Sequence, residues 1–295
     1  MKIGIDVGGG HIAAGLVDNN NEIILKKEHN WTLEEKNFFL KSVEKYCKIF
    51  INDLIKEKNT KIDSIGIGFP APNIVNGVIT KYGQILDLPN IISKEFNITT
   101  YLKNDVKCSG VCEKTIGNIK EYNNCLFMTL GTGIGGAYFY KNEIVKPNKY
   151  QGFEIGHMII NTNGKQCKCG KKGCFEEYAS MRVFRSKIED LFKIERLTSY
   201  KMFEILQSKE KTLEVNNIIE EYIYYLSIGI SNLINIFEPD AICIGGSFAY
   251  YEPIFMGKLK DKIQSNFPNR TIPNILIAKF GNDAGIIGAS MLKSN

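Results

Sequence analysis

A short, glycine-rich part of the chain concentrates residues that bind metal ions. The run "GHMIINTNGKQCKCGKKGCFEEYAS" holds His157, Cys167, Cys169 and Cys174. One nitrogen and three sulfurs are a complete tetrahedral ligand set for zinc. The glycines among them allow the tight turns that a compact site needs. The pattern favours a structural zinc ion over free thiols, and four protein ligands leave no open position for catalysis.

Two other interpretations of the cysteines are weaker. Eight cysteines in 295 residues, with no secretory signal at "MKIGIDVGGG", are not typical of a disulfide scaffold. A zinc ribbon for nucleic acid would usually show two C-x₂-C pairs, and only one irregular set is present. We expect a cytoplasmic protein with reduced thiols. The remaining cysteines fall in helical or strand patterns and are expected in the core: Cys47, Cys108, Cys112, Cys125 and Cys243.

The overall charge is modest. The chain has 37 basic and 32 acidic residues, a net charge of +5, and its lysines form no long block. This favours a solvated surface over nucleic-acid binding, although a positive excess suits an anionic substrate. Because no apolar run reaches about 18 residues, we expect no membrane span.

Glycine-rich turns follow three predicted strands. Consecutive backbone N–H groups in such turns can bind an anion, and the Thr132 hydroxyl could add a donor. Each turn alone is more typical of a tight hairpin, but their recurrence on similar units favours phosphate binding. Asp6, beside the first turn, could hold Mg²⁺ through water. The glycines concerned are Gly8, Gly9, Gly10, Gly131, Gly133, Gly245 and Gly246.

Carboxylates stand at several predicted element ends. Asn104 and Asp105 end the strand "TTYLKNDV", where a carboxylate can take a proton from a substrate hydroxyl. The local sequence alone favours a helix N-cap instead. Glu154 and His157 are three residues apart and would face one way on a helix or tight turn. Glu176 follows the last cysteine of the cluster by two residues.

The elements that carry these residues form two similar halves. The first 30 residues predict a β-meander, followed by one amphipathic helix over 33–58 and a buried strand at "IDSIGIGFP". A strand–glycine turn–strand unit recurs at "NCLFMTLGTGIGGAYFYKN", and helices dominate 181–237. Two such α/β halves imply a cleft between them, and the boundary is expected just after Asp105.

Taken together, these motifs resemble the ROK family, whose name stands for repressor, open reading frame, kinase. "DVGGG", "GIGFPAP", "KNDV", "LGTGIGG", "FEIGHM", "CKCGKKGCFEEYAS" and "IGGS" occur in the family's order, over essentially the whole chain. The cysteine segment with "EIGH" upstream is the most specific of them. Enzymatic members include glucokinases, fructokinases, β-glucoside kinases and N-acetylmannosamine kinases.

The resemblance implies an α/β, actin-like ATPase (ribonuclease H-like) fold of two lobes with a central cleft. We expect a small lobe from residues 1–107 and 282–295, and a large lobe with the zinc loop from 108–281. The resemblance implies ATP and Mg²⁺ as cofactors, structural Zn²⁺ and a sugar substrate. Because family members are often homodimers, a homodimer is compatible with the resemblance.

The resemblance also implies roles for single residues. Asp105 would be the base that deprotonates a sugar hydroxyl. Asn104, Glu154, His157 and Glu176 would bind sugar hydroxyls, with the other nitrogen of His157 on zinc. The zinc site would then fix the orientation of His157 and Glu176, which contact the sugar. The first two glycine turns would hold ATP phosphates, and Gly245 with Gly246 would lie near the nucleoside.

The chain departs from the family pattern near the expected site. Gly10 stands where the family usually has Thr, Ala71 where it usually has Gly, and Phe153 where Gly usually precedes the glutamate. We still expect an active glucokinase-like hexose kinase. The alternatives are an N-acetylmannosamine kinase and a sugar sensor without turnover. We expect no repressor function, because a repressor's helix-turn-helix domain of roughly 70 residues would have to precede a first strand predicted at Lys2.

Overall fold

The computed structural model describes residues 1–70, 74–75, 78–81, 84–146, 152–208 and 212–293. The chain forms two compact units. Unit 1 comprises Met1–Lys120, Ile144–Gly152 and Lys279–Asn295, and unit 2 comprises Glu121–Glu143 and Phe153–Ala278. Unit 1 extends past the boundary predicted at residue 107 because α4 (Asp105–Ile116) packs on α10 (Ala284–Ser290).

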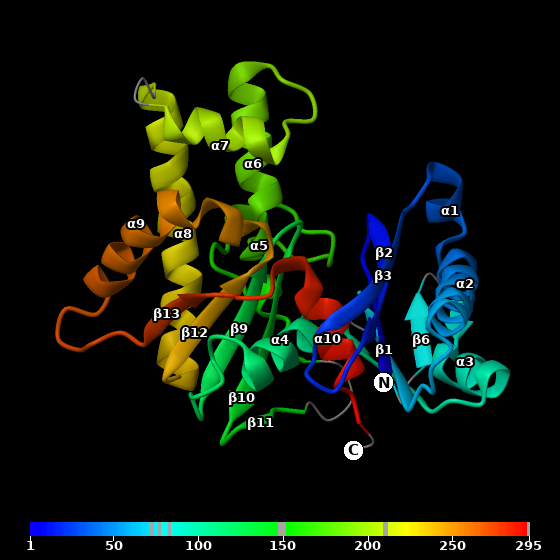
Figure 1. The fold of residues 1–295 in the computed structure, drawn as a ribbon. Coiled ribbons are helices and arrows are strands. Elements are labelled where there is room, and N and C mark those ends of the chain that lie inside the picture. Colours follow the sequence, from blue (N-terminus) through cyan, green and yellow to red (C-terminus); the bar gives the residue numbers. More distant parts are fainter. Residues whose placement is uncertain (71–73, 76–77, 82–83, 147–151, 209–211, 294–295) are drawn as a thin grey trace. The chain divides into compact units, whose positions relative to one another are not determined.

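A five-stranded mixed sheet forms the centre of unit 1 (Figure 1). Its order is β3-β2-β1-β4-β8, in which β1 to β3 are antiparallel neighbours and β4 and β8 continue parallel to β1. A small sheet of β5 (Ile74–Val75), β6 (Val78–Lys81) and β7 (Gln84–Leu86) accompanies it. The five strands are β1 (Lys2–Val7), β2 (His11–Val17), β3 (Ile23–Asn30), β4 (Ser64–Phe69) and β8 (Thr100–Asn104).

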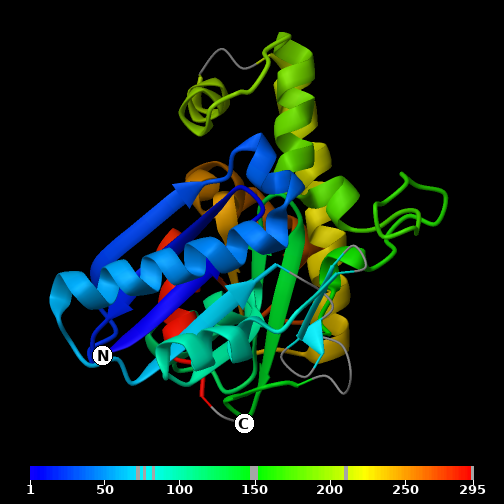
Figure 2. The same ribbon diagram turned by 90° about the vertical axis from the view of Figure 1, so that its right-hand side faces the viewer.

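Helices cover both faces of this sheet. The long helix α2 (Phe39–Lys58) lies across one face, and α10 with α4 lies on the other (Figures 1 and 2). On the α10 side, a Cβ at Gly4 or Gly66 would stand 1.8 Å from a helix carbonyl, so only glycine permits this close approach. A further helix, α3 (Leu88–Phe96), precedes β8.

The helix predicted over 33–58 is in fact two helices, so that prediction was wrong in its continuity. Thr32 starts α1 (Leu33–Asn37) with a capping box to Glu35. Phe38 then leaves the helical conformation, with φ −111° and ψ 40°, and α2 begins at the next residue. No glycine or proline marks this break, so the sequence pattern alone does not reveal it.

Unit 2 repeats the strand arrangement of unit 1, which confirms the predicted duplication. Its sheet order is β11-β10-β9-β12-β13; β9 and β10 form an antiparallel hairpin, and β12 and β13 run parallel to β9. These strands are β9 (Cys125–Leu130), β10 (Ile134–Tyr140), β11 (Glu143–Ile144), β12 (Ala241–Gly245) and β13 (Asn274–Ile277). The helices are α5 (Glu176–Ala179), α6 (Met181–Phe192), α7 (Ser199–Gln207), α8 (Leu213–Phe237) and α9 (Glu252–Ser265).

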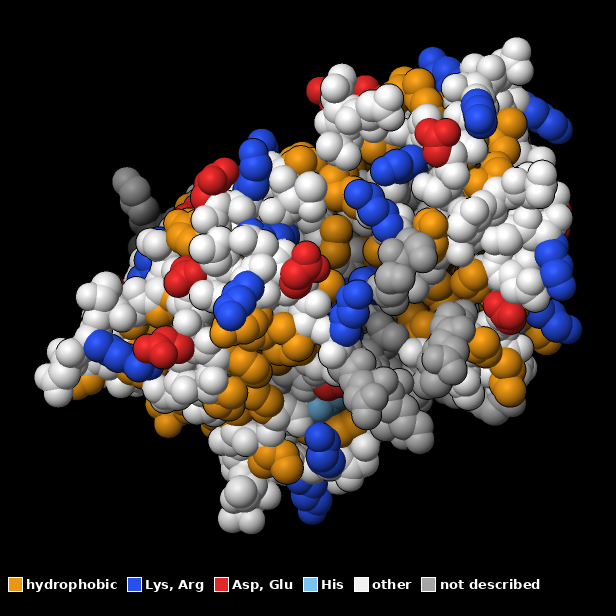
Figure 3. Space-filling model, turned by 90° about the horizontal axis from the view of Figure 1, so that it is seen from below, with side chains coloured by type: hydrophobic (Ala, Val, Ile, Leu, Met, Phe, Trp, Pro, Cys, Tyr) orange, Lys and Arg blue, Asp and Glu red, His pale blue; other side chains and the backbone are white. Residues whose placement is uncertain are grey.

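The surface and core agree with the composition. On the face shown in Figure 3, basic side chains lie scattered among uncharged and hydrophobic ones. All five cysteines expected in the core are 0% exposed. Within the described residues, no helix has the length and apolar character needed to cross a membrane.

Candidate functional site

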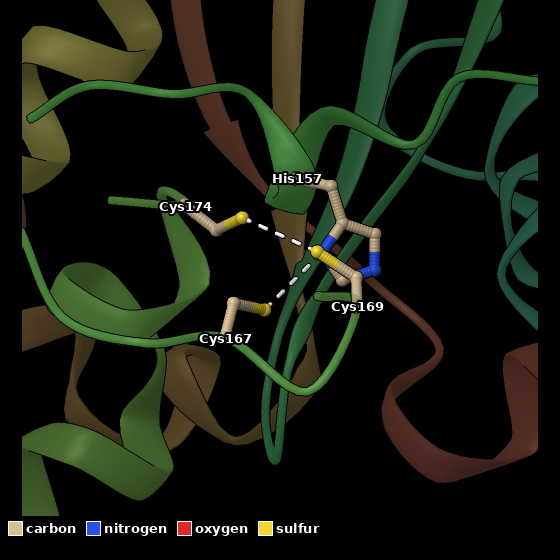
Figure 4. Close-up of side chains that lie close together, drawn as sticks. All are labelled: His157, Cys167, Cys169 and Cys174. Atoms are coloured by element: carbon tan, nitrogen blue, oxygen red, sulfur yellow. Dashed lines mark hydrogen bonds between the residues drawn. The ribbon is translucent and has the colours of Figure 1, made fainter. Parts of the chain in front are cut away.

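The four predicted metal ligands converge in unit 2 (Figure 4). His157, Cys167, Cys169 and Cys174 place one ligand atom each within 4.8 Å of all the others. Sγ of Cys169 and Sγ of Cys174 are 3.5 Å apart, and Nδ1 of His157 is 3.7 Å from Sγ of Cys167. Zinc–sulfur bonds of about 2.3 Å in a tetrahedron separate neighbouring ligand atoms by about 3.8 Å. The donor set therefore fits a zinc ion.

The three thiols of the cluster differ in acidity. Burial raises the pKa of Cys167 to about 12 and raises the pKa of Cys174. A hydrogen bond from the backbone of Lys171 lowers the pKa of Cys169, the exposed member. Buried thiolates need a cation nearby, and a bound metal ion deprotonates its thiol ligands.

A short 3₁₀ turn positions the histidine. The turn η1 (Ile155–His157) begins after Glu154, whose carbonyl accepts the His157 N–H at 2.9 Å. It lies so close to β10 that a Cβ at Gly156 would stand 2.2 Å from the Ile134 carbonyl oxygen. The turn thus starts after Glu154 and ends at His157, and the expectation that their side chains face one way stays a prediction. Nδ1 of the imidazole is on the cysteine side, and its other nitrogen points away (Figure 4).

Glu176 joins the metal cluster to the second glycine turn. Its Oε1 lies 3.5 Å from Sγ of Cys167 and 3.7 Å from Nδ1 of His157. A Cβ at Gly133 would stand 2.8 Å from Oε2 of Glu176, so a side chain at this position would displace the carboxylate. Glycine at position 133 therefore leaves the Glu176 carboxylate in place beside the turn.

Phe153, one of the departures from the family pattern, has a left-handed backbone. Its φ is 58°, a region that costs a bulky residue about 1–3 kcal/mol. Its ring packs on Tyr138 at 5.6 Å and on Phe237 at 5.2 Å between centroids. This aromatic cluster holds the backbone just before Glu154 in the form that glycine adopts freely. Ala71, another departure, lies outside the described residues.

This strain gives a test at position 153. Phe153→Gly and Phe153→Ala both remove the ring, but we expect the glycine variant to be more stable by about 1 kcal/mol because alanine disfavours positive φ. Denaturant unfolding would measure the difference. At Phe139, buried in β10 without a positive φ, the order should reverse. A more stable alanine variant at 153 would contradict the argument.

In unit 1, Asn104 and Asp105 stand where β8 passes into α4. Asn104 is the N-cap, as the local sequence favoured: its Oδ1 accepts the Lys107 N–H at 3.3 Å. Its Nδ2 donates to Oδ1 of Asp105 at 3.0 Å, and the Val106 N–H donates to the same oxygen at 2.9 Å. Two donors thus fix the orientation of the Asp105 carboxylate. The hydrogen bond from Asn104 to Asp105 was not predicted.

Asp6 lies beside Asp105. It pairs with Gly68 across β1 and β4, and β4 in turn pairs with β8, so the carboxyl ends of three parallel strands meet here. A Cβ at Gly68 would stand 3.3 Å from Cα of Asp105 and 3.5 Å from Oδ1 of Asp6. Burial, and secondarily the charge of Asp105, raises the pKa of Asp6 to about 7.

The raised pKa of Asp6 predicts a pH-dependent stability without Mg²⁺. Folding favours the protonated acid, so stability should fall as pH rises from about 4 to about 7, by a few kcal/mol at most. Asp6→Asn should remove this contribution and flatten the difference in unfolding free energy between pH 5 and pH 8. Urea unfolding at both pH values would show it. Parallel pH profiles for the two proteins would contradict the buried acid.

The first glycine turn is a tight hairpin between β1 and β2. The Gly8 N–H donates to the His11 carbonyl at 2.8 Å. Trp31 donates from its indole to the Gly8 carbonyl at 2.9 Å and from its backbone to the Gly10 carbonyl at 3.0 Å. A Cβ at Gly9 or at Gly10 would meet no atom of the described residues within 4 Å. The space beside this turn would therefore accommodate a ligand, or threonine at position 10.

A pocket in unit 2 is lined by the second glycine turn and by Ser247, which follows the glycines of the third turn. Gly246 has a φ of 75° and approaches the carbonyl of Leu130, which precedes the second turn. Within the described part of the chain, a Cβ at Gly131 would meet no atom within 4 Å. The pocket has a volume of about 430 Å³ and is lined by Gly131, Thr132, Met181, Arg182, Arg185, Ser186, Glu189 and Ser247. No sequence pattern pointed to the residues of α6 in this lining.

Comparison with known proteins identifies the family. A model of the ROK family matches residues 2–295. A β-glucoside kinase from Listeria monocytogenes is 30% identical, over 98% of this chain and 96% of that protein. A xylose repressor from Bacillus spizizenii is 28% identical, over 99% of this chain and 76% of the repressor. A glucokinase from Streptomyces griseus, solved with glucose and AMPPNP, is 21% identical with a TM-score of 0.76, covering 98% and 97% of the two chains.

The chain belongs to the ROK family. Its two five-stranded mixed sheets form the actin-like ATPase fold that the sequence motifs implied. Sugar kinases and xylose repressors of this family are similar in identity to this chain. Family membership therefore places the protein in one of two classes, the sugar kinases or the sugar-sensing regulators.

Proposed function

We propose that this protein is a cytoplasmic, ATP-dependent hexose kinase similar to glucokinases. The observation that carries the proposal is the pair of carboxylates in unit 1. Asp105 is oriented by two hydrogen-bond donors and lies beside the buried Asp6, next to an open glycine turn. Phosphoryl transfer needs a base, a site for Mg²⁺ and donors for phosphate oxygens. Sugar sensing alone needs none of these.

The roles follow from the chemistry of the residues. Asp105 accepts the proton of a sugar hydroxyl while that oxygen bonds to the γ-phosphorus of ATP and the bond to the ADP oxygen breaks. Asp6 would hold Mg²⁺ through water, and the bound ion would neutralise negative charge on the phosphates. N–H groups of the turns at Gly8–Gly10 and Gly131–Gly133 bind phosphate oxygens, and Gly245 with Gly246 lie near the nucleoside.

The sugar is bound mainly by side chains that the zinc loop positions. Glu154 and Glu176 accept hydrogen bonds from sugar hydroxyls, and the second ring nitrogen of His157 donates one when the first nitrogen binds zinc. Asn104 supports Asp105 and would reach the sugar only by rearranging bonds that it now makes. Zinc, held by His157 and the three cysteines, supplies rigidity, since its ligand set is complete.

The test is ADP release with MgATP across glucose, N-acetylmannosamine, N-acetylglucosamine, mannose, fructose and a β-glucoside. A preference for glucose supports the proposal, and a preference for N-acetylmannosamine supports the main rival within the same class. Protein that contains zinc and binds ATP, yet releases no ADP with any sugar, would contradict a kinase acting on these sugars.

A sugar sensor without turnover is the second candidate. Two observations favour it: a xylose repressor is among the relatives, and Gly10 lacks the hydroxyl that the family usually places near the phosphates. Because threonine would fit at position 10, Gly10→Thr is the decisive variant. Turnover that appears only in this variant would favour the sensor.

A further inference from the structure

The turn of residues 131–133 has all its carbonyls occupied. The Gly131 N–H donates to the Gly133 carbonyl at 3.0 Å. Arg182 occupies the other two: its backbone N–H donates to the Gly131 carbonyl at 3.1 Å, and its Nε donates to the Thr132 carbonyl at 3.1 Å. Among the described residues, no protein atom accepts the N–H of Thr132 or of Gly133. The turn is thus held with its acceptors satisfied and two donors available for an anion.

Arg182 also connects this turn to the segment after the zinc ligands. Its Nη2 donates to Oε2 of Glu177 at 3.0 Å, and the Glu177 N–H donates to the Cys174 carbonyl at 3.0 Å. The Glu177 side chain is 12% exposed, so this end of the link is well packed, whereas that of Arg182 is 40% exposed. One side chain therefore bridges the turn and the short helix α5.

We propose that Arg182 is a positioning residue that holds the Gly131–Gly133 turn in its anion-binding form, through its link to Glu177. This rests on the proposed nucleotide site, because the anion would be a phosphate group of the nucleotide. Arg182 acts on the phosphate through the turn and not by direct contact. Glu177 lies in the cysteine motif and Arg182 follows it, but the family resemblance assigns a role to neither residue.

The test measures ADP affinity by calorimetry, which does not depend on turnover. Arg182→Met keeps the backbone N–H and the stem but loses both side-chain bonds, so ADP should bind about 10-fold more weakly. Adenosine, which lacks phosphate, should bind within about 2-fold of the wild-type affinity. Lys187→Met is the matched control, because Lys187 also lies on α6 and pairs with a glutamate, Glu221, away from the turn. It should leave ADP affinity within about 2-fold.

A variant of the partner distinguishes positioning from direct contact. Glu177→Ala should weaken ADP binding in the same direction as Arg182→Met, and the double variant should be no weaker than Arg182→Met alone. Unchanged or tighter ADP binding in Glu177→Ala would mean that Arg182 contacts phosphate itself, and the inference would be wrong. Thermal melting and zinc content check that each variant is folded.

The inference and the proposed function can fail separately. Wild-type protein that binds ADP but forms no sugar phosphate refutes the kinase, while the variants still test Arg182. Equal ADP affinity in wild type and Arg182→Met refutes the positioning role and leaves the kinase standing. Wild-type protein that does not bind ADP refutes both.

Discussion

Asp105→Asn is expected to lower kcat for sugar phosphorylation by about 10²–10⁴-fold, the usual contribution of a general base. Asparagine has nearly the same shape and can still accept the bonds that Asn104 and Val106 donate to Oδ1. It cannot accept the hydroxyl proton. Sugar affinity, measured by calorimetry, should therefore change much less than kcat.

Two further variants separate the base from its surroundings. Asp105→Glu retains a carboxylate but moves it by one methylene, so partial activity is expected. Asn104→Ala removes the helix cap and one donor to Asp105, which should lower stability by about 1 kcal/mol. Turnover of Asp105→Asn at the wild-type rate would remove Asp105 from the base role.

Removal of zinc is expected to have the second largest effect. Cys169→Ser breaks the ligand set at its exposed member, so the protein should lose zinc and bind sugar about 10- to 100-fold more weakly. The reason is geometric: zinc would fix His157, and Glu176 lies against both His157 and Cys167. Metal analysis and sugar calorimetry on the same sample measure both effects.

The control for the zinc experiment lies in the same loop. Lys168→Ser changes a neighbour of two ligands without removing a donor atom, and it should keep both zinc and sugar affinity. Chelation of the wild-type protein should reproduce the Cys169→Ser result. Unchanged sugar affinity in zinc-free protein would contradict the view that zinc positions the sugar-binding residues.

The metal cluster was predictable from sequence because its four ligands fall within 18 residues, from His157 to Cys174, and tight turns bring them together whatever the rest of the fold does. The duplicated strand–turn–strand units were predictable for a similar reason, since hairpins are local. The roles of Asp105 and Glu176 came from the family motifs, because each has ordinary local alternatives. Those roles remain proposals.

Other features depend on contacts between distant parts of the chain. Trp31 reaches the carbonyls of the first glycine turn, and Arg182 reaches those of the second from another element. Backbone carbonyls leave no trace in a sequence pattern, so neither link could be predicted. The extent of unit 1 depends likewise on α4 packing against α10, which is far away in sequence.

The most direct test of the kinase is transfer of the γ-phosphoryl group from labelled ATP to the sugar that binds best. Wild-type protein should form labelled sugar phosphate in step with ADP, and Asp105→Asn should bind the sugar but form almost none. Sugar binding of equal strength in both proteins, with no labelled sugar phosphate from either, would contradict the kinase and favour a sensor.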